Sequence, residues 1–230
     1  MKQKTILFDI NETVLNLTAL KPKFVAAFGD DNVMATWFSM LLHSSTVCVV
    51  TDVKTDFASL ARVMLDSIAT RKGISLSAQM RDEILTGFAN LPAHEDIQPA
   101  LRQLQNAGFR TVAFSNSSRD LIAMQINNAG LSECFDEVIS VESTGRFKPD
   151  PQAYQFAAEQ LDQPLSSLRL VATHDWDTHG ALAVGMKAAY IARTPAIYHP
   201  LYRQADIVAA TMGDIVKQII ELDGPLKASV

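Results

Sequence analysis

Residues 5–13 read Thr-Ile-Leu-Phe-Asp-Ile-Asn-Glu-Thr, and this stretch decides the fold. Its first four residues form a short apolar run that ends abruptly in Asp9. A buried strand that delivers a carboxylate at its carboxyl end is typical of an open α/β sheet, where ligands bind outside the carboxyl ends of the strands. The backbone amides after Asp9 would offer donors to an anion, so Asp9 is a candidate nucleophile beside an oxyanion site. The alternative is that Asp9 merely starts a turn.

Composition limits the partners of the chain. It has 230 residues, with 20 Lys and Arg against 25 Asp and Glu, which gives a net charge of −5. This balance argues against nucleic acid or a membrane surface as the main partner and leaves a small anionic substrate open. Cys48 and Cys134 do not suggest a disulfide framework, so we expect a cytoplasmic protein. The first apolar run is too short for a signal sequence, and Gly185 and Lys187 break the longest later one, so we expect no transmembrane helix.

Helical periodicity replaces the strand pattern after Asp9 and continues for about eighty residues. Asp56 is placed as the N-cap of one helix, and Ser77 precedes another. Only residues 46–51, which are rich in β-branched side chains, are ambiguous between helix and strand. We therefore predict an all-helical cap, residues 15–90, inserted into a core of residues 1–14 and 91–230. Its apolar stripes are Val33, Trp37 and Met40/Leu41; Phe57, Leu60, Met64 and Ile68; and Met80, Ile84, Leu85 and Phe88.

Strands and helices alternate in the rest of the chain. This alternation predicts a doubly wound, Rossmann-like parallel sheet that helices cover on both faces. Asp150-Pro151 is a helix start, because a capping side chain precedes a proline at the first helical position. The expected strands after the first are 111–114, 137–140, 168–171, 188–192 and an edge strand at 207–209, and the other expected helices are 99–107, 121–129 and 212–222.

Polar side chains follow the predicted strands. Because the carboxyl ends of strands in a doubly wound sheet lie side by side, these residues should converge on one crevice. A carboxylate, a hydroxyl–amide pair, a lysine and a second acidic cluster suit anion chemistry on a covalent aspartyl intermediate. The four groups are Asp9, Asn11 and Thr13; Ser115 and Asn116; Lys148; and Thr173, His174, Asp175 and Asp177.

These groups resemble, in order and over essentially the whole chain, the four motifs of the haloacid dehalogenase superfamily. The helical insertion resembles the caps of the class that includes 2-haloacid dehalogenases and many small-molecule phosphatases. The Ser115-Asn116 pair, Tyr154 after Lys148, and Trp176 before Asp177 resemble the dehalogenase branch. The matched motifs are Phe8-Asp9 through Thr13, Phe114-Ser115-Asn116, Lys148-Pro149-Asp150-Pro151, and Thr173 through Asp177.

Asn11 distinguishes the two branches of the superfamily. Phosphatases have an aspartate there that protonates the leaving group, whereas an amide has no titratable proton to donate and a halide needs none. Loss of a general acid would cost a phosphatase roughly 10²–10⁴ in rate, so Asn11 favours carbon–halogen cleavage. Three positions depart from the dehalogenase pattern: Glu12 replaces a glycine, Gly29 stands where a cap arginine would bind halide, and His174 replaces an asparagine.

The resemblance implies a mechanism in which Asp9 attacks the α-carbon of a short 2-halo acid and forms an aspartyl ester that water then opens. Asp177 would position or deprotonate that water, and Lys148 between the two carboxylates would keep both ionised. Backbone amides around Ile10 and Asn11 would stabilise the oxyanion. No cofactor is required.

Further residues are assigned supporting roles by the same resemblance. Ser115 and the amides of 115–116 would hold the substrate carboxylate at a helix start, and Thr13 would hydrogen-bond Asp9. Tyr154 would support Lys148 or Asp177, unless it is only a core residue. His174 would assist water activation, contact the halide or be structural. The candidate halide contacts are Asn116, His174 and Trp176.

Two other functions stay open at this point. One is a Mg²⁺-dependent phosphatase that holds its metal with Asp9, the carbonyl of Asn11, and Asp175 or Asp177. The other is a catalytically idle relative that binds a small acid or a protein partner. An exposed apolar stripe on the cap would also allow a homodimer.

Overall fold

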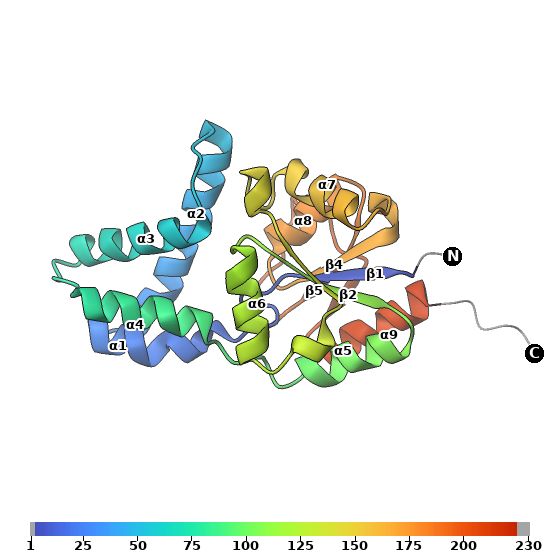
Figure 1. Ribbon diagram of the computed structural model, residues 1–230, viewed down its shortest axis with the longest axis horizontal. Helices are drawn as coiled ribbons and strands as arrows, with labels where there is room; N and C mark the ends of the chain where they lie inside the picture. Colours follow the sequence, from blue (N-terminus) through green and yellow to red (C-terminus); the bar gives the residue numbers. More distant parts are fainter. Residues whose placement is uncertain (1–2, 225–230) are drawn as a thin grey trace, which may run out of the picture.

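The computed structural model describes residues 3–224 and contains one six-stranded parallel sheet (Figure 1). The strand order is β3-β2-β1-β4-β5-β6, and every neighbouring pair is parallel. The predicted α/β fold with a doubly wound parallel sheet is confirmed. The strands are β1 (Thr5–Phe8), β2 (Arg110–Ser115), β3 (Glu137–Ser140), β4 (Leu168–Ala172), β5 (Lys187–Ile191) and β6 (Ile207–Ala209).

The central position of β1 explains its apolar sequence. All four residues of β1 and all five of β4 are buried, as expected for strands covered on both faces. Phe8, the last residue of β1, pairs with Ala113 of β2 and Val171 of β4, and these two strands end one or two residues beyond that level. This register brings Asp9, Ser115 and Thr173 to one edge of the sheet.

Five helices cover the sheet, with α7 and α8 on one side and α5 and α9 on the other (Figure 1). The predicted start at Asp150-Pro151 is confirmed, since the Asp150 carboxylate accepts a hydrogen bond from the Gln152 amide at 2.8 Å. These helices are α5 (Ile97–Asn106), α6 (Arg119–Asn128), α7 (Pro151–Gln160), α8 (Asp175–Ala183) and α9 (Met212–Asp223). Short 3₁₀ helices are η1 (Leu17–Leu20), η2 (Ser132–Cys134), η3 (Glu142–Thr144) and η4 (Leu165–Ser167).

A block of four helices lies between β1 and the remaining strands: α1 (Lys21–Phe28), α2 (Asn32–Thr51), α3 (Phe57–Arg71) and α4 (Ala78–Ala89). We call this block the cap. Trp37 is fully buried at its centre, packs tilted against Phe24 and edge-to-face against Phe88, and donates its indole N–H to the Ala61 carbonyl at 2.9 Å. Asp56 is the N-cap of α3, as predicted, because its carboxylate accepts a hydrogen bond from the Ser59 amide at 2.7 Å.

Residues 46–51, ambiguous in sequence, form the last turns of α2. The hydroxyls of Thr46 and Thr51 donate to the carbonyls of Leu42 and Val47, four residues earlier, so these β-branched side chains hydrogen-bond within the helix. Helix α2 is also long and apolar enough, by length and composition alone, to cross a membrane. That is a weak indication, because the core helix of a soluble protein passes the same test and α2 buries Trp37 and its neighbours within the cap.

Candidate active site

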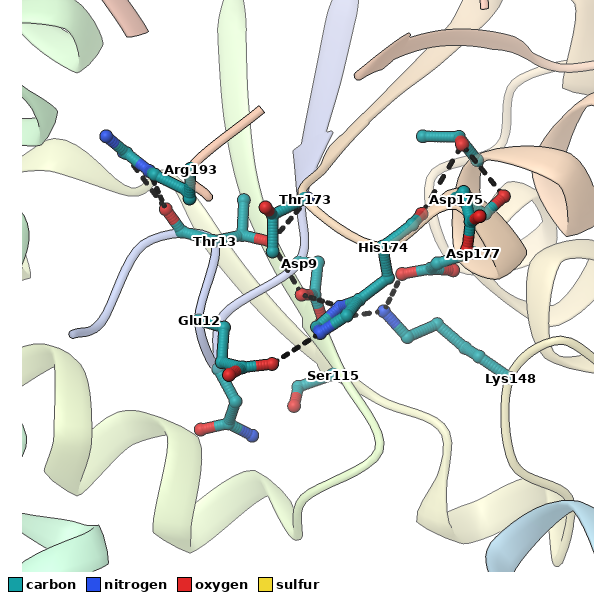
Figure 2. Close-up of polar contacts among 12 residues, drawn as sticks. Asp9, Glu12, Thr13, Ser115, Lys148, Thr173, His174, Asp175, Asp177 and Arg193 are labelled. Atoms are coloured by element: carbon teal, nitrogen blue, oxygen red, sulfur yellow. Dashed lines mark hydrogen bonds and ion pairs between the residues drawn. The ribbon is translucent and has the colours of Figure 1, made fainter. Parts of the chain in front are cut away.

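Asp9, Lys148 and Asp177 form a buried charged cluster at the carboxyl end of the sheet (Figure 2). The Lys148 Nζ atom lies 2.9 Å from Asp9 Oδ1 and 2.6 Å from Asp177 Oδ2. Asp9 follows β1, Asp177 lies in the first turn of α8, and Lys148 comes from the loop before α7. The sheet therefore brings together three side chains that are far apart in sequence, and one ammonium bridges two carboxylates.

The environment separates the acidities of the two carboxyl groups. Burial alone would raise the pKa of Asp9, but Lys148, His174 and Thr13 hold it well below its ordinary value. Burial raises the pKa of Asp177 above its ordinary value, and Lys148 only partly opposes that effect. Burial would lower the pKa of Lys148, but Asp177 and Asp9 raise it. Asp9 is thus suited to be an ionised nucleophile and Asp177 a proton acceptor.

Several contacts fix the turn that carries Asp9. The Thr13 hydroxyl donates to Asp9 Oδ2 at 2.7 Å and accepts from the Thr173 amide at 2.9 Å. The guanidinium of Arg193 donates to the Thr13 carbonyl at 3.1 Å, and Asp96 holds that guanidinium at 2.8 Å. The predicted Thr13–Asp9 contact is therefore present, and Arg193 is a supporting residue that sequence reasoning missed.

Asn11 lies in a chain of side-chain amides and hydroxyls. Its Nδ2 donates to Ser117 Oγ at 3.4 Å, and its Oδ1 accepts from Gln125 Nε2 at 3.2 Å. The same Gln125 nitrogen donates to the Phe88 carbonyl at the end of the cap, at 2.9 Å. Neither Ser117 nor Gln125 was predicted; the available signal was a glutamine on the buried face of α6, beside Ile122 and Ile126.

Ser115 and Asn116 lie at the carboxyl end of β2, as expected. The Ser115 hydroxyl accepts from the Ser117 amide at 3.2 Å, and Asn116 Oδ1 accepts from the Lys148 amide at 2.9 Å. The Asn116 contact anchors the backbone of the lysine loop, a role that the sequence did not suggest.

Tyr154 is both a core residue and a partner of Asp177, the two alternatives that the sequence left open. It is fully buried, and its hydroxyl donates to Asp177 Oδ1 at 2.7 Å. Gly180 makes room for it, because a Cβ atom at Gly180 would lie 2.5 Å from the Tyr154 oxygen. Tyr154 therefore supports Asp177, and Lys148 approaches the other oxygen of the same carboxylate.

His174 connects Asp9 to Glu12 (Figure 2). Its Nε2 lies 2.8 Å from Glu12 Oε2, and its Nδ1 lies 3.3 Å from Asp9 Oδ2. The ring stacks on Trp176, with 5.2 Å between ring centroids. Burial would lower the pKa of His174, but Asp9 and Glu12 raise it to about 10. The contact between His174 and Glu12 is one that sequence reasoning missed.

A small cavity of about 10 Å³ lies above Asp9, room for roughly one water molecule. The core contributes its polar floor and the cap its apolar roof. Gly29, where a dehalogenase would have its cap arginine, ends α1 in a left-handed conformation with φ 70°. The lining residues are Asp9, Asn11, Ser115, Asn116, His174 and Trp176 from the core, with Phe38, Leu42 and Phe57 from the cap.

The carboxylates expected to hold Mg²⁺ in the phosphatase alternative have other partners in the structure. The Asp175 carboxylate accepts a hydrogen bond from the His199 amide at 3.1 Å, and the Lys148 ammonium lies between Asp9 and Asp177. Within residues 3–224, no group of three or more His, Cys, Asp or Glu side chains is arranged to hold a metal ion.

Comparison with known sequences places the chain among haloacid dehalogenase-like proteins. The family model for haloacid dehalogenase-like hydrolases matches residues 3–168. The chain is 28% identical to (S)-2-haloacid dehalogenase 1 of Pseudomonas sp. (strain CBS-3), over 83% of this chain and 85% of that one. It is 23% identical to (S)-2-haloacid dehalogenase of Pseudomonas sp. (strain YL), over 93% of each chain.

The fold also matches a solved structure of Xanthobacter autotrophicus L-2-haloacid dehalogenase with chloropropionic acid covalently bound. The TM-score is 0.87 at 21% sequence identity, and the match covers 96% of this chain and 100% of the other. At this identity the likeness establishes the fold alone.

Proposed function

We propose that this chain, which belongs to the haloacid dehalogenase-like hydrolases, cleaves the carbon–halogen bond of short 2-haloalkanoic acids. One observation carries the proposal: a buried ammonium, that of Lys148, joins Asp9 to Asp177, 2.9 Å and 2.6 Å away, in a site that has Asn11 in place of a general acid. Displacement of halide by a carboxylate needs no proton donor for the leaving group, whereas expulsion of an alcohol from a phosphate ester does.

In the first step, the ionised Asp9 carboxylate attacks the α-carbon and expels halide, which forms an aspartyl ester. Lys148 and Thr13 orient that carboxylate through contacts of 2.9 Å and 2.7 Å. The ordering of the two carboxyl pKa values keeps Asp9 ionised and nucleophilic.

In the second step, water attacks the Cγ atom of the ester and yields a 2-hydroxy acid. Asp177 accepts the proton of this water, helped by its raised pKa and by the Tyr154 hydroxyl that orients it. Lys148 and the amides of Ile10 and Asn11 stabilise the tetrahedral oxyanion.

Substrate size and orientation follow from the cavity lining. Ser115 and Asn116 bind the substrate carboxylate, while Trp176, Phe38 and Phe57 enclose the carbon chain and the halogen. Because the cavity has room for about one water molecule, entry of even a two-carbon acid requires the cap to shift. The names of the curated relatives support this substrate class.

Halide release from chloroacetate and 2-chloropropionate, measured with and without EDTA, tests the proposal. We expect chloride release that EDTA does not change, and no hydrolysis of p-nitrophenyl phosphate. Phosphatase activity that EDTA abolishes would instead establish the magnesium enzyme. Binding of the acids without turnover would establish an idle relative.

The ester itself is tested by one turnover in ¹⁸O-labelled water with enzyme in excess. We expect the label in the peptide that contains Asp9. Label found only in the hydroxy acid would contradict a covalent intermediate on Asp9.

A further inference from the structure

Glu12 and His174, two of the positions that depart from the dehalogenase pattern, contact each other. Glu12 holds a left-handed backbone conformation, φ 66°, that suits glycine and disfavours other residues. Its carboxylate lies 2.8 Å from His174 Nε2, and His94 Nε2 contacts its carbonyl at 3.1 Å. A glutamate occupies a strained backbone position, and its carboxylate contacts the active-site histidine. This combination suggests that the negative charge of Glu12 acts on His174.

The other nitrogen of His174 faces the nucleophile. Its Nδ1 atom is buried, lies 3.3 Å from Asp9 Oδ2 and makes no well-aligned hydrogen bond. Because a carboxylate stands at each ring nitrogen, a neutral ring would turn a lone pair toward one of them. The geometry therefore favours the imidazolium. The uncharged Phe38 and Trp176 also pack on the ring. Lys148 contacts the opposite oxygen of Asp9, and the adjacent Asp175 carboxylate accepts from the His199 amide.

We propose that Glu12 is a positioning residue that holds His174 as an imidazolium, and that His174 protonates the departing oxygen when the aspartyl ester on Asp9 is hydrolysed. This inference rests on the proposed function, since it concerns the second half of that reaction. It assigns the ester linkage to Asp9 Oδ2, beside His174, and the oxyanion to Oδ1, beside Lys148.

The atoms of this step balance as follows. Water adds to Cγ of Asp9 and gives one proton to Asp177. The Cγ–Oδ2 bond then breaks, its electron pair stays on Oδ2, and that oxygen takes the Nδ1 proton and leaves as the hydroxyl of the product. Asp9, now a carboxylic acid with a solvent oxygen, returns its proton to His174, and Asp177 releases the other proton to solvent. One proton is released for each halide.

Charge explains why the proton moves at this step and not before. In the resting enzyme both Asp9 and Glu12 favour the charged ring, and His174 keeps its proton. Alkylation removes the charge of Asp9, so the imidazolium becomes more acidic when an alkoxide must depart. Lys148 retains both its proton and its contact with Asp177, which suits it to stabilise an oxyanion.

The test separates ester formation from ester hydrolysis in Glu12→Gln and Glu12→Gly, with the exposed Glu142→Gln as the control. Rapid-quench chloride release reports the first step, intact-protein mass spectrometry reports the ester, and the pH profile of ester decay reports the acid. We expect a chloride burst within about threefold of wild type and ester decay slower by roughly 10–100-fold. Esterified enzyme should therefore accumulate, and the alkaline limb of the decay profile should move to lower pH. Glu142→Gln should behave as wild type.

Glu12→Gly distinguishes a lost charge from a damaged fold. Glycine relieves the strain at φ 66°, so this variant should melt at a higher temperature than Glu12→Gln, which lacks the same charge, and still accumulate ester. Ester decay at the wild-type rate in both variants, or equal slowing of both steps, would overturn the inference. A wild-type enzyme that forms no ester would overturn the proposed function, and that result needs no variant.

Discussion

Each end of the sheet carries a charge cluster in which one buried cation lies between two carboxylates. At the carboxyl end, Lys148 lies between Asp9 and Asp177. At the amino end, Arg169 of β4 lies 2.6 Å from both Asp206 and Asp223, and Lys187 adds a second cation at 2.5 Å from Asp223.

The two clusters differ in their hydrogen-bond partners and in their burial. The Arg169 guanidinium donates to both oxygens of Asp206, to Asp223 and to the Ala188 carbonyl. Each of its three nitrogens therefore has a partner within the protein. Asp206 is half exposed, whereas the side chains at Lys148 are almost completely buried. The Lys148 cluster opens onto the cavity under the cap instead.

Charge alone therefore does not mark a reactive site. Burial would raise the pKa of Asp223, yet Arg169 and Lys187 bring it below its ordinary value, which describes an ion pair that only holds structure. At the other end, the pKa values of the two carboxyl groups move in opposite directions. That divergence, beside a cavity, indicates acid–base chemistry.

Removing the nucleophile should have the largest effect on activity. In Asp9→Asn we expect halide release to fall by a factor on the order of 10⁴ or more, with the fold retained, because an amide does not displace halide. The matched control is Asp175→Asn in the adjacent motif, which should retain wild-type turnover. An inactive Asp175→Asn enzyme would instead favour the metal-dependent reading.

Removing either central cation should destabilise the protein, but only one of the two should affect turnover. Lys148→Met leaves two buried carboxylates without their partner, at a cost of about 3–5 kcal/mol in the free energy of unfolding. Arg169→Met should cost less, because Asp206 is half exposed and Asp223 keeps its contact with Lys187. Halide release per folded molecule should fall roughly 10²–10⁴-fold in Lys148→Met and stay unchanged in Arg169→Met. Urea unfolding and active-site-normalised rates measure both. Equal loss of activity in the two variants would remove the distinction between the clusters.

The Lys148 end should also have its own dependence of stability on pH, through His174. The pKa of this histidine is raised to about 10 in the fold, so its stabilising effect is complete below about pH 6.5 and lost as pH rises toward 10. We expect the free energy of unfolding to fall by roughly 1–3 kcal/mol more in wild type than in His174→Asn over that range. Parallel pH profiles for the two proteins would contradict a charged His174.

Tyr154→Phe should give the smallest change. Loss of the 2.7 Å hydrogen bond to Asp177 should slow turnover by about tenfold. Because that bond lowers the pKa of Asp177, its loss raises the pKa further, and the acidic limb of the pH–rate profile should move to higher pH. An unshifted acidic limb would mean that Asp177 is not the base whose ionisation limits the rate.

Most of the fold could be predicted from the sequence because local signals coincide with the elements. The apolar run before Asp9 and the Asp150-Pro151 start are local features, and both appear as expected. Residues 46–51 were ambiguous because β-branched residues favour strands, whereas in the structure the threonines among them bond back to helix carbonyls.

The site could be predicted where its residues belong to motifs, most of which follow strand ends. Asp9, Ser115 and Lys148 belong to such motifs and lie together in the structure. The supporting residues depend on tertiary contacts that no spacing reveals: Arg193 reaches Thr13 from 180 residues away, and Gln125 reaches Asn11 from 114. The Glu12–His174 pair joins two positions that each seemed a separate departure from the family pattern.

Gln125 connects the last cap helix to Asn11, two residues after the nucleophile, because its Nε2 donates to the Phe88 carbonyl at 2.9 Å and to Asn11 Oδ1 at 3.2 Å. An outward movement of α4 would break the contact between Gln125 and Phe88 and leave Asn11 held by a side chain that has lost one of its own partners. The position of the cap and the order of the amide chain at Asn11 are therefore coupled through this one glutamine.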